Sequence, residues 1–283
     1  MLLFFITSLF AFKADVSDEK IANGKTLMIE FNKDKNVMYE KAVFDKKSFQ
    51  IFQNPIDSTK MYALIPISYY DKPSNKKIKI YYKEKKSEIK KTISIDVIDG
   101  QYEKEKIQVS DSKVHPNKED AARGKKEYAE AMAVYNHVTK KSYLTSEFIF
   151  PMQSKITSAF GKARVYNDTL KGYHSGTDFR AAVGTPIYAS NDGVVALVKD
   201  RFYSGGTIII DHGQGIYTCY FHMSKFDVKK GQKVSKGTQI GLSGDSGRVT
   251  GPHLHFAARV GGVQVDPLQL ITLLNEKLLR GTK

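Results

Sequence analysis

Two histidines stand two residues apart in a short apolar run, Gly251-Pro252-His253-Leu254-His255-Phe256. In an extended strand, successive side chains point to opposite faces, so His253 and His255 project to one side while Leu254 packs on the other. The run therefore predicts a strand that is buried on one face and carries polar chemistry on the other. His174 and Asp178 form a second cluster upstream, and their even spacing also allows them to share a face.

Three of these groups could give zinc a shell of two imidazoles and one carboxylate, with one coordination position left for water. That arrangement is typical of catalytic zinc sites rather than structural ones. The chain contains a single cysteine, Cys219, which excludes an intramolecular disulfide and a cysteine-built zinc finger. We expect Cys219 to be a buried strand residue because it lies within the apolar run 217–221. The set of two histidines and one aspartate, with a position left for water, favours a hydrolytic enzyme.

The N-terminal part predicts an antiparallel β domain over residues 15–112. At 283 residues and 41% apolar content, the chain can form two domains and a sizeable core. Short apolar runs alternate with turn clusters, which favours a small β-sandwich. Nothing in this part has metal-ligand spacing, so we expect it to serve in positioning, inhibition or partner contact. The predicted strands include residues 26–31, 61–67, 78–82 and 92–98.

A helical linker is expected over residues 113–147. Apolar residues recur at helical intervals between Asn117 and Thr139, which predicts one amphipathic helix. The proline-containing stretch 112–117 marks the boundary with the β domain. His115 and His137 are isolated from other ligand-type residues, so we expect surface histidines rather than zinc ligands.

Residues 148–283 predict a second, mostly antiparallel β domain, so that the chain as a whole is mainly β. Glycines at 205, 206, 213 and 215 stand where hairpin turns need positive φ angles. The segment 267–279 has helical apolar spacing and should pack over one edge. The predicted strands are 193–198, 207–210, 216–221, 239–241 and 253–260.

The first residues predict an export signal, placed at 1–14. Residues 1–12 form an apolar run too short to cross a bilayer as a helix, and polar sequence follows from Lys13. No basic residue precedes the run, which departs from the usual signal pattern. We expect export and no stable membrane span.

The net charge of +14 predicts attraction to polyanions. The basic residues are mostly lysines interleaved with acids, whereas a nucleic-acid reader more often shows an arginine-rich helix or an aromatic stacking platform. We therefore expect weak affinity for the acidic polymers of a cell envelope and no nucleic-acid partner.

Several blocks in order resemble the M23 family of zinc metallopeptidases, also called LytM or lysostaphin-type domains. The resemblance covers about Phe150 to Pro267, and the N-terminal part is loosely similar to accessory regions of exported Gram-negative members. The blocks are His174-x-x-x-Asp178, Asp211-His212-Gly213-x-Gly215, His222, Gly231-x-x-Val234-x-x-Gly237-x-x-Ile240-Gly241 and the His253 to Phe256 run.

The resemblance implies that His174, Asp178 and His255 are zinc ligands and that His222 and His253 are the further catalytic histidines. It leaves open which of the two histidines is the general base. In some members an upstream tyrosine contacts the oxyanion, and Tyr166 and Tyr173 are the local candidates.

The spacing from Tyr166 to His174 is longer than the usual pattern, and in an extended segment Tyr173 would point away from His174. A structural role is the alternative for both tyrosines, and Tyr166 is kept as the candidate for the oxyanion contact. His212 belongs to the turn motif and should hydrogen-bond the hairpin. Ala257 stands where many members carry an acidic residue. That residue is not a zinc ligand, so its absence affects only a contact that could orient His255 or a neighbour.

The implied function is a zinc-dependent endopeptidase that hydrolyses D-alanyl-diaminopimelate cross-links between peptidoglycan stem peptides, in wall remodelling or cell shape. Alternatives are D,D-carboxypeptidase action in the same site, or a non-enzymatic LytM-type activator of another wall hydrolase. A biotinyl or lipoyl carrier is a third class, suggested by the run Gly231 to Gly237, but that class explains none of the histidines. We also hypothesise that the N-terminal domain or the 117–139 helix covers the groove in a latent form.

Overall fold

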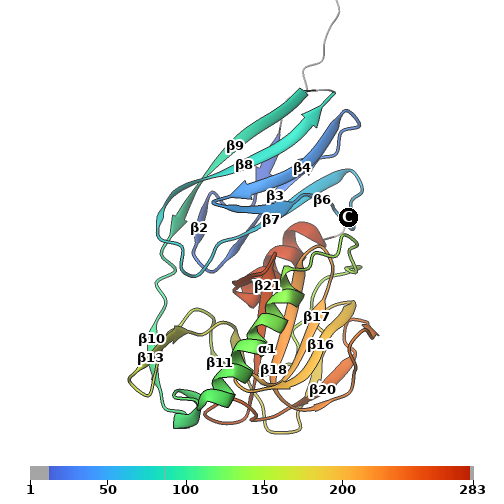
Figure 1. The fold of residues 1–283 in the computed structure, drawn as a ribbon. Helices are drawn as coiled ribbons and strands as arrows, with labels where there is room; N and C mark the ends of the chain where they lie inside the picture. The colour runs from blue at the N-terminus through green and yellow to red at the C-terminus, as the bar shows by residue number, and fades with distance from the viewer. Residues whose placement is uncertain (1–12, 86, 281–283) are drawn as a thin grey trace, which may run out of the picture.

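The computed structural model describes residues 13–85 and 87–280 (Figure 1). Two β-rich parts lie one above the other, and helix α1 runs across the front of the lower part. Most of the expected signal segment, residues 1–12, lies outside the described residues.

The upper part is a sandwich of two sheets, as the sequence predicts. Its core lies between them and includes Leu27, Ile29, Ile65, Ile78 and Ile80. Pairing is antiparallel except between β2 and β9. One sheet has the order β1 (Ala14–Val16), β3 (Thr26–Asn32), β7 (Lys60–Pro66), β6 (Phe52–Gln53), and the other β2 (Lys20–Ala22), β9 (Ser87–Ile98), β8 (Ser74–Glu84), β4 (Val37–Phe44), β5 (Lys47–Gln50).

The lower part is built on an antiparallel ten-stranded sheet, which confirms the mainly β prediction. Its path is β11 (Ile156–Ser158), β14 (Thr177–Arg180), β21 (His253–Val260), β18 (Ile216–Phe226), β17 (Gly205–Asp211), β16 (Gly193–Arg201) and β19 (Lys233–Val234). Three further strands join it: β15 (Pro186–Tyr188), β20 (Gln239–Ser243) and β22 (Val263–Val265).

Strand β21 shows the predicted alternation. Leu254 and Phe256 are fully buried in the main core of this part. Ala257 stands two residues beyond His255, on the same face of the strand, and packs with the residues beneath α1. An acidic side chain at position 257 would therefore be buried under this helix, which gives a physical reason for alanine there.

Helix α1 (Lys118–Asn136) begins at Asn117, whose side chain accepts a hydrogen bond of 2.8 Å from the backbone N–H of Asp120. This cap explains why the predicted start is accurate. Tyr135 on α1 packs with Tyr217 and Cys219 on β18, and Cys219 is buried as expected. The helix ends at Asn136, before the predicted end at Thr139.

Strand β10 (Lys104–Ile107) departs from expectation. It lies within the stretch 15–112 assigned to the N-terminal domain, yet it pairs in parallel with β12 (Ala163–Tyr166) of the lower part. Strand β13 (Leu170–Tyr173) completes this small sheet. A short 3₁₀ helix, η1 (Asp111–Lys113), follows β10, and the domain boundary at 112/113 stays a prediction.

The two parts are joined by buried polar contacts. The Tyr62 hydroxyl donates to the Gln214 side chain at 2.5 Å. Helix α2 (Pro267–Leu273) continues as the π-helical turn η2 (Leu274–Leu278), close to the predicted 267–279 segment. Its Gln269 side chain bonds both backbone groups of Thr26 in the sandwich, at 2.9 and 2.8 Å.

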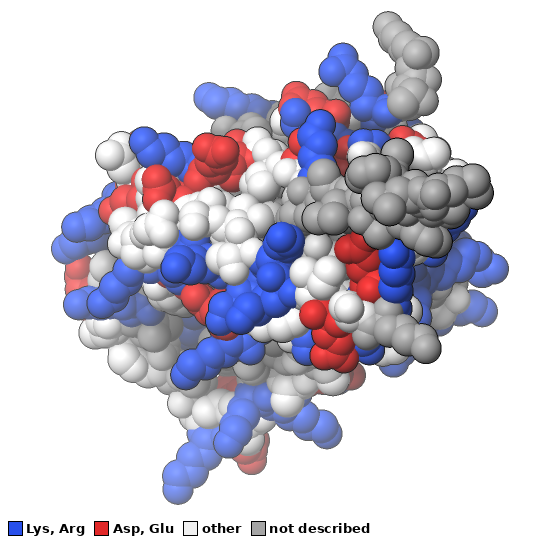
Figure 2. Space-filling view, turned by 90° about the horizontal axis from the view of Figure 1, so that it is seen from above, with Lys and Arg blue, Asp and Glu red and all other residues white. Residues whose placement is uncertain are grey.

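Among the described residues, none of the helices has the length and apolar character needed to span a bilayer. On the face seen in Figure 2, basic side chains are spread over the surface and interspersed with acidic ones. This distribution agrees with the scattered lysines of the sequence.

Candidate metal centre

His174, Asp178 and His255 converge into one buried cluster. Asp178 on β14 is paired in register with His255 on β21, and His174 lies just beyond the end of β13. His174 Nε2 lies 2.9 Å from Asp178 Oδ1 and 3.0 Å from His255 Nδ1, and the latter two atoms are 2.8 Å apart. In the part of the chain that the structure describes, this is the group suited to hold a metal ion.

The tautomer of neutral His174 is determined by a backbone contact. Its Nδ1 lies 2.7 Å from the Ala159 carbonyl oxygen, which can only accept, so in the neutral ring Nδ1 carries the proton and Nε2 presents a lone pair to the cluster. Two imidazole nitrogens and a carboxylate oxygen this close together fit a divalent metal ion.

Asp178 is held in its charged form. Burial alone would raise its pKa, but the contacts with His174 and His255 outweigh burial and hold the pKa of Asp178 well below its usual range. Burial lowers the pKa of His255 to about 4, so its imidazole is neutral at pH 7. A neutral imidazole and an ionised carboxylate are the forms that bind metal.

Gly176 makes room for the cluster. A side chain at this position would meet the backbone oxygen of Phe256 at 2.4 Å and His255 Nε2 at 2.6 Å. The close approach of the loop before β14 to β21 therefore requires glycine.

Arg164 contacts the outer side of the cluster and was not singled out by the sequence. Its Nη2 lies 3.4 Å from Asp178 Oδ2 and 3.2 Å from Ser158 Oγ. Its Nε donates to Glu105 at 2.6 Å, on strand β10. Strand β10 is thus connected to the metal cluster through Arg164. No local sequence motif marks this connection, because Glu105, Arg164 and Asp178 are far apart in the chain.

His222 and His253 lie beside the cluster, as the resemblance implied. His253 Nδ1 donates to the Gly251 carbonyl at 2.8 Å, and His222 Nδ1 donates to the Ser246 carbonyl at 2.7 Å. In its neutral form each ring therefore has its unprotonated nitrogen at Nε2. His253 Nε2 is 3.6 Å from Asp178 Oδ1, and the His222 and His253 ring centroids are 4.8 Å apart.

His222 is held in a strained conformation. Its φ angle is +62°, at an irregularity of β18 where the pairing with neighbouring strands shifts register. Burial, followed by the neighbouring His255 and His253, lowers the pKa of His222 to about 3. Strain of this kind in a non-glycine residue is characteristic of functional positions.

Both tyrosines considered for contact with the oxyanion lie at the cavity beside the cluster. Tyr166 is buried and lines the cavity beside the cluster. Tyr173 lines it too. Tyr173 stacks on Tyr69 at 3.8 Å, and burial raises its pKa to about 12.

The other histidines lie outside the cluster. His212 donates from Nδ1 to the Asp192 carbonyl and accepts from Thr218 at Nε2, both at 2.7 Å. Burial lowers its pKa to about 4. His115 and His137 are exposed, as expected.

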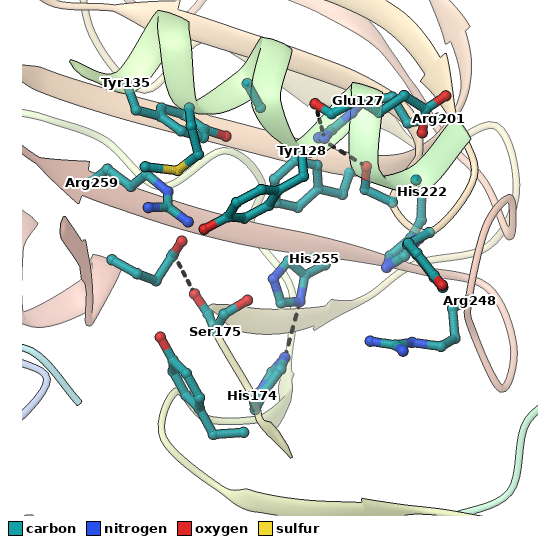
Figure 3. A pocket seen from close by; sticks show the side chains of 18 of the residues that line it. Glu127, Tyr128, Tyr135, His174, Ser175, Arg201, His222, Arg248, His255 and Arg259 are labelled. Atoms are coloured by element: carbon teal, nitrogen blue, oxygen red, sulfur yellow. Dashed lines mark hydrogen bonds between the residues drawn. The ribbon is translucent and has the colours of Figure 1, made fainter. Parts of the chain in front are cut away.

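A cavity of about 260 Å³ opens beside the cluster, between the sheet and α1. His174, His222 and His255 line one side, and Tyr128 and Met132 of α1 line the other. Figure 3 shows Tyr128 reaching from the helix across the space near His255. The helix thus forms a wall of the cavity, and its covering role in a latent form stays a hypothesis.

The antiparallel sheet and its buried His-Asp-His cluster define a domain of the metallopeptidase class. Residues 172–267 match peptidase family M23, so the chain carries a domain of this family, as the resemblance indicated.

Two curated relatives share this region. The peptidoglycan DD-endopeptidase ShyA of Vibrio cholerae is 47% identical over 123 residues, which cover 42% of this chain and 29% of ShyA. The DD-carboxypeptidase/endopeptidase Mpg of Neisseria meningitidis is 41% identical over 97 residues, covering 34% of this chain and 22% of Mpg. The match thus spans less than a third of either relative.

A crystal structure assigned to peptidase M23 from Pseudomonas aeruginosa is similar over both parts of the chain. It superposes with a TM-score of 0.68 at 26% identity, covering 89% of this chain and 95% of that one. The combination of the sandwich with the M23 domain therefore recurs in a solved structure.

Proposed function

We propose that the chain is a zinc-dependent peptidoglycan endopeptidase that hydrolyses D-alanyl-diaminopimelate cross-links between stem peptides. The observation that carries the proposal is the convergence of His174, Asp178 and His255, with His222 and His253 beside them. The name of ShyA, a peptidoglycan DD-endopeptidase, supports the reaction and the substrate.

The donor set supports zinc as the metal. Zinc favours nitrogen and oxygen ligands in tetrahedral sites, and catalytic sites use three protein ligands. When bound, zinc supplies Lewis acidity, which polarises a carbonyl oxygen and lowers the pKa of water.

His253 is our candidate for the general base. Its unprotonated Nε2 is close to the cluster and the ring is partly accessible, so it can take a proton from the attacking water and pass it to the leaving amine. His222 is more deeply buried and neutral at pH 7, and its unprotonated Nε2 can accept a hydrogen bond from the water or the amide. Tyr166 is the candidate for contact with the developing oxyanion.

An extracytoplasmic site of action follows from this substrate. We place the protein in the periplasm, exported by the segment 1–14, with residues 15–112, 113–147 and 148–283 as sandwich, helical linker and peptidase domain. Envelope proteins are candidate partners.

The test is digestion of purified sacculi by the wild type and by Asp178→Ala, with products identified by mass. We expect the wild type to remove cross-linked dimers and to hold one zinc per chain, and Asp178→Ala to lose both zinc and more than about 100-fold in rate, since even outer contacts are worth 10- to 100-fold. Asp227→Ala removes the same charge from a surface strand end and should behave like the wild type. Equal dimer removal by wild type and Asp178→Ala would refute the proposal.

Carboxypeptidase action is the second candidate, and the name of Mpg supports it. It predicts loss of terminal alanine from uncross-linked stems in the same digest. An activator role is not favoured, because all five histidine and aspartate positions of the motif are present and converge. A carrier role is also not favoured, because it explains none of the histidines that converge at the cluster.

A further inference from the structure

The cavity beside the metal cluster is lined by more basic than acidic side chains. Four arginines line it, at positions 164, 201, 248 and 259, against one acid, Glu127. Both Glu127 oxygens are occupied, one by Arg123 at 2.8 Å and the other by the backbone N–H of Phe202 at 2.8 Å. We therefore expect a ligand of this cavity to carry negative charge.

Three of the four arginines bind acceptors within the protein. Arg164 is paired with Glu105. Arg201 donates to the Glu127 carbonyl at 2.8 Å, and Arg259 donates to the Gly262 carbonyl at 2.7 Å while its guanidinium lies over the Tyr135 ring. These contacts hold the three side chains in place within the protein.

Arg248 is different. Its guanidinium lies 4.3 Å from the centre of the Tyr166 ring and 5.1 Å from that of Tyr203. Within residues 13–85 and 87–280, no acceptor bonds its guanidinium N–H groups, whereas its backbone N–H donates to the Tyr203 carbonyl at 2.8 Å. The two rings orient a planar fork of donors that has no partner in the protein.

Arg248 lies to one side of the metal cluster. Figure 3 shows Arg248 and Arg259 on opposite sides of His255, with Arg248 on the side of His222. A peptide bound across the metal cluster would therefore have Arg248 to one side of the bond that is cut.

We propose that Arg248 binds a carboxylate of the substrate next to the scissile amide, and thereby selects diaminopimelate-type cross-links. The inference rests on the proposed function. Diaminopimelate has two amines and two carboxylates, and the amine acylated by D-alanine stands on a carbon that bears a free carboxylate. A guanidinium binds such a group through two parallel hydrogen bonds.

This interaction discriminates between substrates. A glycine bridge offers no carboxylate at that position, and an amidated diaminopimelate keeps the shape but loses the charge. Either would leave the Arg248 donors without their partner in a half-enclosed cavity, a loss that binding sites discriminate against strongly.

The experiment compares cross-linked muropeptide dimers with a free or an amidated diaminopimelate carboxylate next to the scissile bond. For the wild type we expect amidation to raise KM about 10- to 100-fold, the range for a hydrogen bond to a charged group. Arg248→Gln should show the same high KM for both dimers, with kcat changed less than KM, and Arg248→Lys should fall between. Lys199→Gln removes a positive charge from an exposed ion pair with Glu130 and should keep the wild-type discrimination.

A binding measurement separates this proposal from the proposed function. Calorimetry with uncross-linked tetrapeptide stems, free and amidated, reports carboxylate recognition without cleavage. If the wild type cuts no dimer but Arg248→Gln alone loses preference for the free stem, the endopeptidase proposal fails and the carboxylate site stands. If the wild type cuts dimers and Arg248→Gln retains the wild-type preference in both assays, the assignment of Arg248 is overturned.

Discussion

Arg164 holds the outer oxygen of Asp178, so its substitution should weaken metal binding without removing a ligand. We predict that Arg164→Gln lowers zinc affinity about 10- to 100-fold, the usual effect of losing an outer contact. Competition against a chromogenic chelator measures this directly. Glu105→Gln, which weakens the ion pair with Arg164 and a longer one with Lys162, should have a smaller effect in the same direction. Unchanged affinity in Arg164→Gln would show that the contact is incidental.

The residues of the cluster could be predicted from the sequence, whereas their supports could not. His253 and His255 lie in one run, and His174 and Asp178 in another, so local spacing marks both pairs. Arg164 contacts Asp178 only because β12 and β14 come together in the fold, and it meets Glu105 through the unexpected pairing of β10 with β12. Arg248 is similar, since its isolation from acceptors is a property of the folded cavity.

His212 should make stability depend on pH. Burial holds it neutral, with a pKa lowered from its ordinary 6.5 to about 4, while in the unfolded chain it takes up a proton near 6.5. Its contribution is therefore complete above pH 6.5 and is lost as pH falls toward 4. Between pH 7 and pH 4.5 we expect a loss on the order of 2 to 3 kcal/mol from this group.

Urea unfolding of the wild type and His212→Gln at the two pH values tests the contribution of His212. The variant should be less stable at pH 7 but lose less stability on acidification. Identical losses in both proteins would mean that His212 is not the group responsible.

At the scale of elements, the alternation of apolar and polar residues in strands and the capping residue of α1 made most of the lower part predictable. Strand β21 has one apolar and one polar face, and α1 begins at a side-chain cap that is visible in the sequence. The partner of β10 was not predictable, because a short strand carries no information about which sheet it joins. The sequence likewise predicted α1, but it did not identify Ala131 and Tyr135 as the residues that pack on the sheet.

Tyr135 anchors α1 to that face, so its removal should loosen the helix. The side chain is 4% exposed, packs against Tyr217 and hydrogen-bonds Cys219 Sγ at 3.3 Å. We predict that Tyr135→Ala lowers the free energy of unfolding by about 3 to 5 kcal/mol, as for other large buried side chains. Tyr135→Phe keeps the ring and should cost only about 1 kcal/mol.

Hydrogen exchange locates the effect of losing the Tyr135 ring. In Tyr135→Ala the amides of residues 118–136 should exchange faster than in the wild type, while those of the main sheet core change less. If the helix keeps its protection, Tyr135 does not anchor it.

At the scale of the molecule, the sandwich and the peptidase domain share a core. Met28, Tyr62 and Leu64 of the sandwich belong to the same buried cluster as Ile216, Val260 and the residues of α2. Both parts also occur together in the Pseudomonas aeruginosa structure. The sequence predicted each part separately, because contacts between distant segments leave no periodic pattern.

Gln269 is the contact whose loss should uncouple the two parts. Its side chain bonds both the N–H and the carbonyl of Thr26, a residue with 0% exposure at the start of β3. Gln269→Met keeps a similar volume but leaves these two buried backbone groups without partners, which costs about 1 to 3 kcal/mol each. Thr272→Ala alters an exposed side chain of the same helix and should leave stability nearly unchanged.

Urea unfolding combined with hydrogen exchange distinguishes uncoupling of the two parts from general destabilisation. In Gln269→Met, the amides of β3 and β7 should exchange markedly faster, while those of β16 and β17 retain wild-type protection, because the second pair lies far along the sheet from α2. A uniform rise in exchange over both parts would instead mean that sandwich and peptidase domain unfold as one unit even without this contact.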